Sequence, residues 1–171
     1  MDFSFNADQT SLGETVARML ADHPGLLAPE PLPAAQDSAW EALAELGLFA
    51  LLVPESYGGA GLSLVDLAPA VEALGAGLAP PAAVATLAAT DLLVRHGNHR
   101  QQAAWLSRIA SGTVSMGFAV LEADQGYDPQ DAGCSHQDGV LSGTKILVEG
   151  AARADLLMVL AQILSEFTKA W

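Results

Sequence analysis

The chain has 171 residues, of which 51% are hydrophobic, and a mean hydropathy of +0.31. Its 7 basic and 20 acidic residues give a formal net charge of −13, which repels phosphate backbones and argues against nucleic-acid binding. A single cysteine, Cys134, excludes an intrachain disulfide. No signal-peptide pattern is present and no apolar stretch approaches the ~20 residues of a membrane span, so we expect a cytoplasmic protein.

Five helices are predicted before residue 113. Apolar repeats and stop signals place them at about 7–21, 38–47, 63–78, 83–95 and 100–111. The first three begin with a capping-box pattern, at Asn6 and Gln9, Ser38 and Glu41, and Ser63 and Asp66. We expect Leu46, Leu64 and Leu78 on buried faces. The fourth helix is apolar nearly all round, which predicts a central position.

The pattern changes after Gly112. Residues 115–122 read as a strand, 140–148 as a hairpin half that turns into a second strand, and 156–161 as a third. Residues 156–171 also fit a helical stripe, so strand and helix both remain open there. The predicted fold is mainly α: a five-helix N-terminal bundle at 1–113, then an incomplete antiparallel β-domain at 114–171. Three strands cannot bury both faces of a sheet without further cover.

Chemistry-bearing motifs are sparse. No nucleophile elbow, Walker loop or GxGxxG pattern occurs, and the four histidines share no metal-ligand spacing, so we predict neither catalytic nor metal-binding residues. The glycines of residues 58–61 are best explained by a structural turn. We expect the acids Glu122 and Asp124 to be solvated, and Cys134 to act as a small apolar residue.

Five segments, taken in order, resemble the acyl-CoA dehydrogenases. They are MDFSF at 1–5; LGL at 46–48 after Trp40, with VPESYGGAG at 53–61; Leu74-Gly75; WLSRIASG at 105–112; and LSGTK at 141–145, followed by Ala154-Asp155. The resemblance covers about residues 1–161, and the tail from about 162 matches no family segment. It implies a helical first domain and a small β-domain, with binding of FAD and of acyl-CoA.

The resemblance also implies an activity for a complete protein. The family removes hydrogens from the α and β carbons of an acyl-CoA thioester, with a carboxylate as base and flavin N5 as hydride acceptor. A third, helical domain usually carries that carboxylate and much of the oligomer contact, and nothing here matches it. We therefore expect a truncated or partial dehydrogenase that is inactive alone and belongs to a homo- or hetero-oligomer.

The flavin-side motifs depart from the family pattern. The resemblance assigns cofactor contact to Phe118, Val120, Leu121 and Gly126 on one segment and to Leu147 and Glu149 on another, and substrate contact to Tyr127. Leu121 stands for a hydroxyl residue, Tyr127 for a serine, Leu147 for a tryptophan and Glu149 for a threonine. Leucine cannot replace a lost hydrogen bond, and an unpaired carboxylate in such a pocket is costly.

These departures leave three interpretations open. The chain is part of a catalytic flavoenzyme, or a non-catalytic partner subunit with weak or no flavin binding, or a fragment without activity of its own. The acyl substrate is not readable from the residues.

Overall fold

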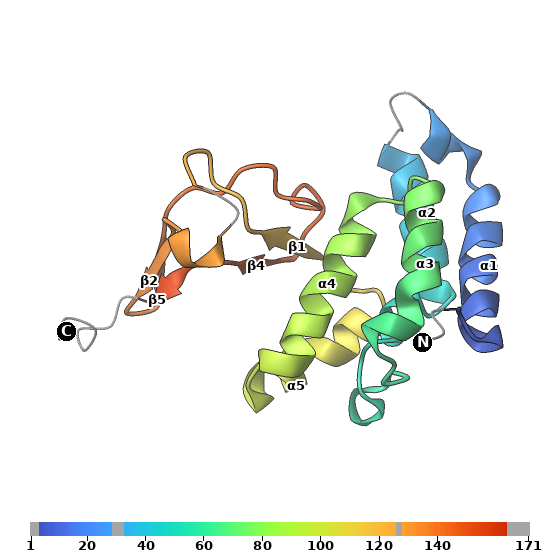
Figure 1. The fold of residues 1–171 in the computed structure, drawn as a ribbon, viewed down its shortest axis with the longest axis horizontal. Helices are drawn as coiled ribbons and strands as arrows, with labels where there is room; N and C mark the ends of the chain where they lie inside the picture. The colour runs from blue at the N-terminus through green and yellow to red at the C-terminus, as the bar shows by residue number, and fades with distance from the viewer. Residues whose placement is uncertain (1–3, 29–32, 126–127, 164–171) are drawn as a thin grey trace.

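The computed structural model describes residues 4–28, 33–125 and 128–163. Within these ranges five α-helices precede a small β segment (Figure 1). The helices are α1 (Ala7–Ala21), α2 (Pro33–Glu45), α3 (Leu64–Ala76), α4 (Pro81–His96) and α5 (His99–Ala110). Short 3-10 turns occupy Pro24–Leu27, Leu48–Ala50, Glu55–Tyr57 and Pro129–Asp131. The predicted fold class, a helical bundle followed by a partial β-domain, is confirmed.

Helix ends follow the capping chemistry in two of the three predicted cases. Reciprocal capping boxes begin α1 at Asn6 and α3 at Ser63, and another, not predicted, begins α5 at Asn98. The start predicted at Ser38 is wrong, because α2 begins at Pro33. Proline suits a first helical turn, where its missing N–H costs nothing, and the following alanines favour helix.

The main core lies among α1, α2, α3 and the 48–53 segment. It includes Val16, Trp40, Leu43 and Phe49, and the Trp40 and Phe49 rings stack with centroids 4.2 Å apart. Three leucines expected in the core are exposed instead, namely Leu46, Leu64 and Leu78. Each lies in the first or last turn of a helix or just beyond it, where the apolar face no longer meets a neighbouring element.

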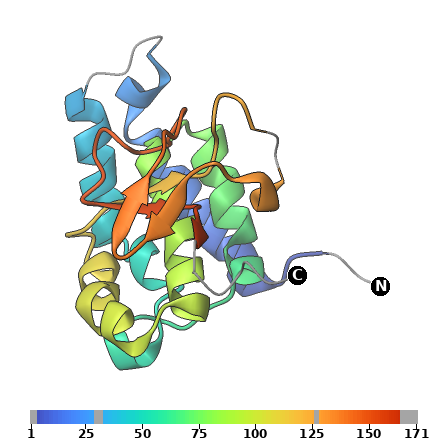
Figure 2. The same ribbon diagram turned by 90° about the vertical axis from the view of Figure 1, so that its left-hand side faces the viewer.

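Helix α4 is the central element, as predicted. Figures 1 and 2 show it between the other helices and the strands, and eight of its residues are buried. On its β side it packs against β1, which is the first strand after the helical part. A helix with neighbours on several sides needs apolar or small residues around most of its circumference, which explains its composition.

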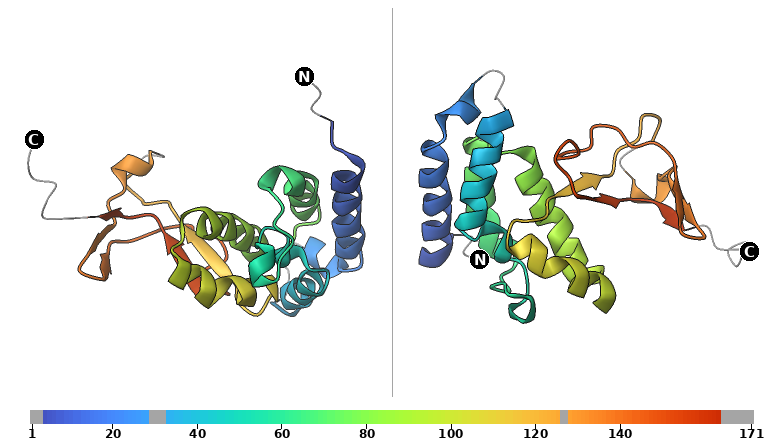
Figure 3. Two further views of the ribbon diagram at one scale, coloured as in Figure 1. Left: turned by 90° about the horizontal axis from the view of Figure 1, so that it is seen from below. Right: turned by 180° about the vertical axis from the view of Figure 1, so that it is seen from behind.

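The described residues of the β segment form five short strands. They are β1 (Met116–Ala119), β2 (Ser135–Gln137), β3 (Val140–Ser142), β4 (Leu156–Val159) and β5 (Gln162–Ile163). β1 pairs with β4 in parallel, while β2 pairs antiparallel with β3 and parallel with β5. Among these strands, the predicted antiparallel pairing therefore holds for the β2–β3 hairpin, and it recurs in an isolated bridge between Phe118 and Glu149. Figure 3 shows this segment projecting from one side of the helical part.

Two strand predictions change in detail. The strand expected over 140–148 ends at Ser142, because positive φ values at Gly143 (141°) and Leu147 (50°) break the extended backbone. Residues 156–159 and 162–163 are strand and not helix. The remainder of the ambiguous tail, 164–171, lies outside the described residues.

Candidate functional site

The two segments predicted to face a flavin lie side by side. Phe118 N donates to Glu149 O at 3.4 Å in an antiparallel bridge, and Ile146 N donates to Leu121 O at 2.9 Å. The loop before β4 is thereby fastened along β1 and the residues that follow it. Phe118 and Leu121 thus share one edge with Glu149, which comes from a later segment of the chain. Gly126 and Tyr127 lie outside the described residues.

The side chains on this edge are mostly apolar or turned to solvent. Leu147 is 79% exposed and Glu149 is exposed, with no hydrogen-bond partner for its carboxylate among the described residues. Leu121 and Val120 are half-buried. The carbonyl oxygen of Val120 already accepts a hydrogen bond from Lys145 Nζ at 2.9 Å.

Behind this edge lies a nearly buried ion pair. Lys145 Nζ and Glu122 Oε1 are 2.6 Å apart, and their side chains are 7% and 9% exposed. The same carboxylate accepts hydrogen bonds from Gly133 N (2.7 Å, to Oε2) and Cys134 N (2.9 Å, to Oε1). Both oxygens of Glu122 are thereby occupied, which satisfies a charge that burial would otherwise penalise. The expectation that Glu122 is solvated is wrong.

These contacts shift the pKa values of Glu122 and Cys134 in opposite directions. The hydrogen bond from Lys145, followed by that from the Cys134 backbone, lowers the pKa of Glu122 from 4.5 to about 2. Burial, and then the Glu122 carboxylate, raise the pKa of the Cys134 thiol above its usual value. The buried thiol is therefore held in its neutral, weakly nucleophilic form at neutral pH.

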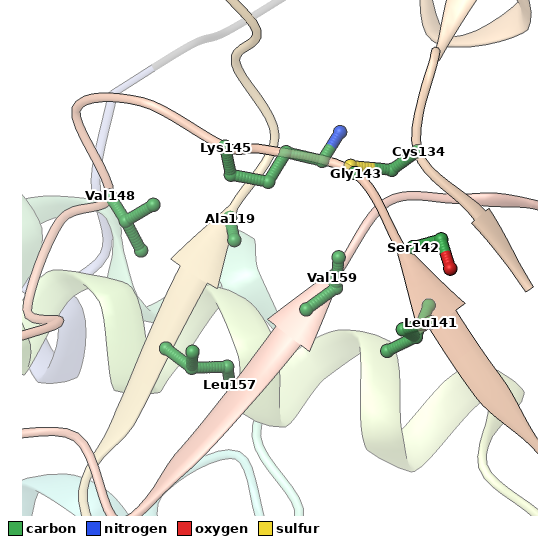
Figure 4. A pocket seen from close by; sticks show the side chains of 9 residues that line it. All are labelled: Ala119, Cys134, Leu141, Ser142, Gly143, Lys145, Val148, Leu157 and Val159. Carbon is green, nitrogen blue, oxygen red and sulfur yellow. The ribbon is translucent and has the colours of Figure 1, made fainter.

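A cavity of about 310 Å³ opens beside the ion pair (Figure 4). Ala119, Val148, Leu157 and Val159 give it an apolar wall, and Lys145 and Cys134 lie along its other side. Its size is at the lower end of the range for small-molecule pockets. The described part of the chain offers no group of three His, Cys, Asp or Glu that could hold a metal ion.

Hydroxyl groups fix the β segment to the helices. Thr86 Oγ1, fully buried on α4, accepts from Met116 N at 2.9 Å and lies 3.3 Å from Met116 O, to which it donates. Asp155 Oδ2 accepts from both Ser115 N (2.8 Å) and Ser115 Oγ (3.0 Å). The backbone hydrogen bond from Ser115 lowers the pKa of Asp155. The start of β1 is therefore held from both sides.

A second link joins the β segment to α2. Arg153 pairs with Asp37, and its guanidinium lies 4.8 Å from the centroid of the Trp40 ring. Trp40 Nε1 donates in turn to Gly112 O at 3.0 Å, at the end of the helical part. The Trp40 ring thus packs in the core, its N–H binds the end of the helical part at Gly112, and its outer face contacts Arg153 of the β segment.

The sequence analysis predicted residues of this edge, but it did not predict the ion pair behind it. It assigned Phe118, Val120, Leu121, Leu147 and Glu149 to the flavin side, and these assignments stay predictions. It treated Glu122 as a solvated acid and Lys145 only as part of a family motif, and it did not single out Thr86. Only the pairing of segments more than twenty residues apart brings Glu122 and Lys145 together, so no local pattern could have found the contact.

The side chains of this edge do not fit FAD. Leu121 and Leu147 present no hydrogen-bond donor to a flavin ring, and Leu147 presents no aromatic face. Glu149 presents a carboxylate, which is an acceptor and would repel the cofactor's phosphates. Leu121 and Leu147 therefore supply apolar contact only, and recognition of a flavin here would depend on backbone groups.

The architecture is that of a helical domain leading into the β-domain of a flavin-dependent dehydrogenase. It is similar to the crystal structure of an acyl-CoA dehydrogenase complexed with FAD from Bacillus anthracis, with a TM-score of 0.76 and 26% identity. That match covers 94% of this chain and 29% of the other. None of the described helices is long and apolar enough to cross a membrane.

Sequence comparison identifies the family. The model of the acyl-CoA dehydrogenase N-terminal domain matches residues 6–113, and the chain belongs to the acyl-CoA dehydrogenase family. It is 34% identical over 128 residues to (2S)-methylsuccinyl-CoA dehydrogenase of Cereibacter sphaeroides, covering 71% of this chain and 23% of that protein. It is 32% identical over 162 residues to acyl-CoA dehydrogenase FadE28 of Mycobacterium tuberculosis, covering 94% and 43%. The chain thus spans less than half the length of either relative.

Proposed function

We propose that this chain forms the helical wall and the flavin-side strands of an FAD-dependent acyl-CoA dehydrogenase. The complete protein would carry out α,β-dehydrogenation of an acyl-CoA thioester, a step of fatty-acid-type metabolism in the cytoplasm. The observation that carries the proposal is the antiparallel contact of residues 118–121 with 146–149 beside α4, in a chain whose helical part matches the family.

The role of this chain in that reaction is to shape a pocket. Helix α4 and β1 are locked together through Thr86 and Met116, which gives the edge a rigid support. The described residues place no carboxylate at the edge with the partners of a tuned base, since Glu149 is exposed and Glu122 is engaged by three donors. The base would therefore come from elsewhere in the complete protein.

A second candidate is a non-catalytic partner subunit with weak or no flavin binding. The side chains of Leu121, Leu147 and Glu149 favour it, because they offer a flavin no donor and no aromatic face. Several large apolar side chains on the β segment are more than half exposed, which favours association with another chain; these are Val140, Leu141, Leu147, Leu157 and Ile163. Either candidate therefore implies a homo- or hetero-oligomer.

One preparation tests both candidates. The chain, tagged in its native setting, is purified together with whatever it is joined or bound to, and acyl-CoA thioesters of graded length are added without oxygen. Bleaching of a flavin absorbance band by at least one thioester is the expected result. A preparation without flavin, or with flavin that no thioester bleaches, would overturn the proposed function.

The location of the flavin separates the two candidates. After the preparation is resolved into its chains, each chain is titrated with FAD and the quenching of flavin fluorescence is followed. Binding to the polypeptide that contains this sequence supports the dehydrogenase. Binding only to a separate chain supports the partner subunit.

A further inference from the structure

The Glu122 carboxylate accepts hydrogen bonds from three donors, which come from two separate segments. Lys145 Nζ and Cys134 N reach Oε1 at 2.6 and 2.9 Å, and Gly133 N reaches Oε2 at 2.7 Å. In each of the other ion pairs among the described residues, one side chain is more than half exposed: Arg95 (56%) in its pair with Asp91, and Asp37 (58%) in its pair with Arg153. Burying a charge is costly, so the partners of Glu122 are expected to matter more for the local structure than those of an exposed ion pair.

The geometry of these contacts closes one particular loop. Glu122 lies in the segment that follows β1, which ends at Ala119, and Gly133 and Cys134 are the last residues before β2. The two backbone hydrogen bonds therefore clasp residues 123–132 at both ends. Gly133 is fitted to this contact, because a Cβ there would lie 2.7 Å from Glu122 Oε2.

We infer that Glu122 is a positioning residue, whose carboxylate fixes both ends of the 123–132 loop by accepting two backbone N–H groups, while Lys145 neutralises and orients it. The family resemblance assigns flavin and acyl-thioester contact to positions within this stretch of sequence. A role of Glu122 in the reaction therefore rests on the proposed function. The clasp itself is a property of the fold and is measurable without any ligand.

An acceptor role differs from an ordinary ion pair in one testable respect. Exchanging the two residues, as Glu122→Lys with Lys145→Glu, keeps one positive and one negative charge in contact. An ammonium at position 122 has three donors and no acceptor, so it cannot bind the N–H groups of Gly133 and Cys134. A simple ion pair would survive the exchange, whereas the clasp would not.

The test is hydrogen exchange of the Gly133 and Cys134 amides, together with the labelling rate of the Cys134 thiol, which is the only cysteine in the chain. In the exchanged variant both rates are expected to rise about tenfold or more, the equivalent of losing one hydrogen bond to a charged group. Exchange in α4 and β1 should stay near the wild-type rate. Matched controls are Asp124→Asn, an exposed carboxylate of the same loop, and the surface exchange Asp91→Arg with Arg95→Asp.

Gly133→Ala is a second variant that leaves every charge in place. Its added Cβ displaces the carboxylate, so it should raise the same local rates, whereas Lys145→Met, which keeps both acceptors, should raise them less. Wild-type protection in the exchanged variant, or a rise spread equally over the helices, would overturn the inference. Because no FAD or acyl-CoA is present, this result is independent of whether the proposed dehydrogenase function holds.

Discussion

Thr86 bears a hydroxyl that no solvent reaches, yet both of its hydrogen bonds go to the backbone of Met116. Replacing it by valine keeps the shape and leaves the N–H and C=O of Met116 without that partner. We expect Thr86→Val to lower the free energy of unfolding by about 1–3 kcal/mol. Urea denaturation followed by circular dichroism measures the change.

The matched control lies one turn further along α4. Thr90 is also fully buried, but its hydroxyl donates only to Thr86 O, a carbonyl inside the helix. Thr90→Val should therefore cost clearly less than Thr86→Val. Equal losses for the two variants would show that Thr86 does not hold β1.

Acid should weaken the fold through its hydrogen-bonded carboxylates. The pKa of Glu122 falls from 4.5 to about 2 on folding, so the stability it contributes is complete above about pH 5 and is lost as the pH falls toward 2. Hydrogen bonds from Ser63 and from Ser115, respectively, also lower the pKa values of Asp66 and Asp155, and act in the same direction. The urea midpoint should therefore decline between pH 5 and pH 2.

The variant Glu122→Gln isolates the largest of these contributions. It lacks the titrating group, so its midpoint should be lower than that of the wild type at neutral pH and should fall less on acidification. Parallel midpoint curves for the two proteins would contradict the assignment of the lowered pKa to Glu122.

At the scale of elements, two glycines have opposite roles. A Cβ at Gly59 would lie 1.9 Å from Val53 O and 2.5 Å from Ala50 O, so the 50–61 turn closes only around a residue without one. A Cβ at Gly75, inside α3, would meet nothing within 4 Å. We expect Gly59→Ala to destabilise by about 2–4 kcal/mol and Gly75→Ala to stabilise by up to about 1 kcal/mol.

Thermal unfolding of both variants checks this pair. The melting temperature should fall for Gly59→Ala and rise slightly for Gly75→Ala. An unchanged melting temperature for Gly59→Ala would show that the turn can relax around a Cβ. It would contradict the claim that the turn requires a glycine at position 59.

Local chemistry explains which elements the sequence could predict. Helix α1 was predicted with its observed ends, because Asn6 and Gln9 form a capping box and the helix stops just before Pro24. The start of α2 was missed because the serine-and-glutamate pattern at Ser38 also occurs inside helices. A capping motif allows a helix to begin but does not require it, and the helix-favouring alanines before Ser38 extend α2 toward the N-terminus.

At the scale of the whole molecule, the change from helices to strands after Gly112 was readable and the strand pairing was not. β1 and β4 are separated by most of the β segment, so their parallel pairing leaves no local pattern. The Glu122–Lys145 contact likewise joins residues that are far apart in the sequence, so no local pattern predicts it. The residues predicted to face a flavin were singled out only through the family resemblance, since Leu121 and Leu147 carry no chemical signal by themselves.

The proposed function depends on a predicted flavin-side edge at which Leu121, Leu147 and Glu149 offer a flavin neither a hydrogen-bond donor nor an aromatic face. The direct test is an FAD titration of this chain against the variant Leu121→Thr, Leu147→Trp and Glu149→Thr, followed by quenching of flavin fluorescence. The variant regains a hydroxyl, an aromatic face and a neutral side chain, so we predict binding about tenfold tighter or more. Equal FAD affinity in the two proteins would contradict the account.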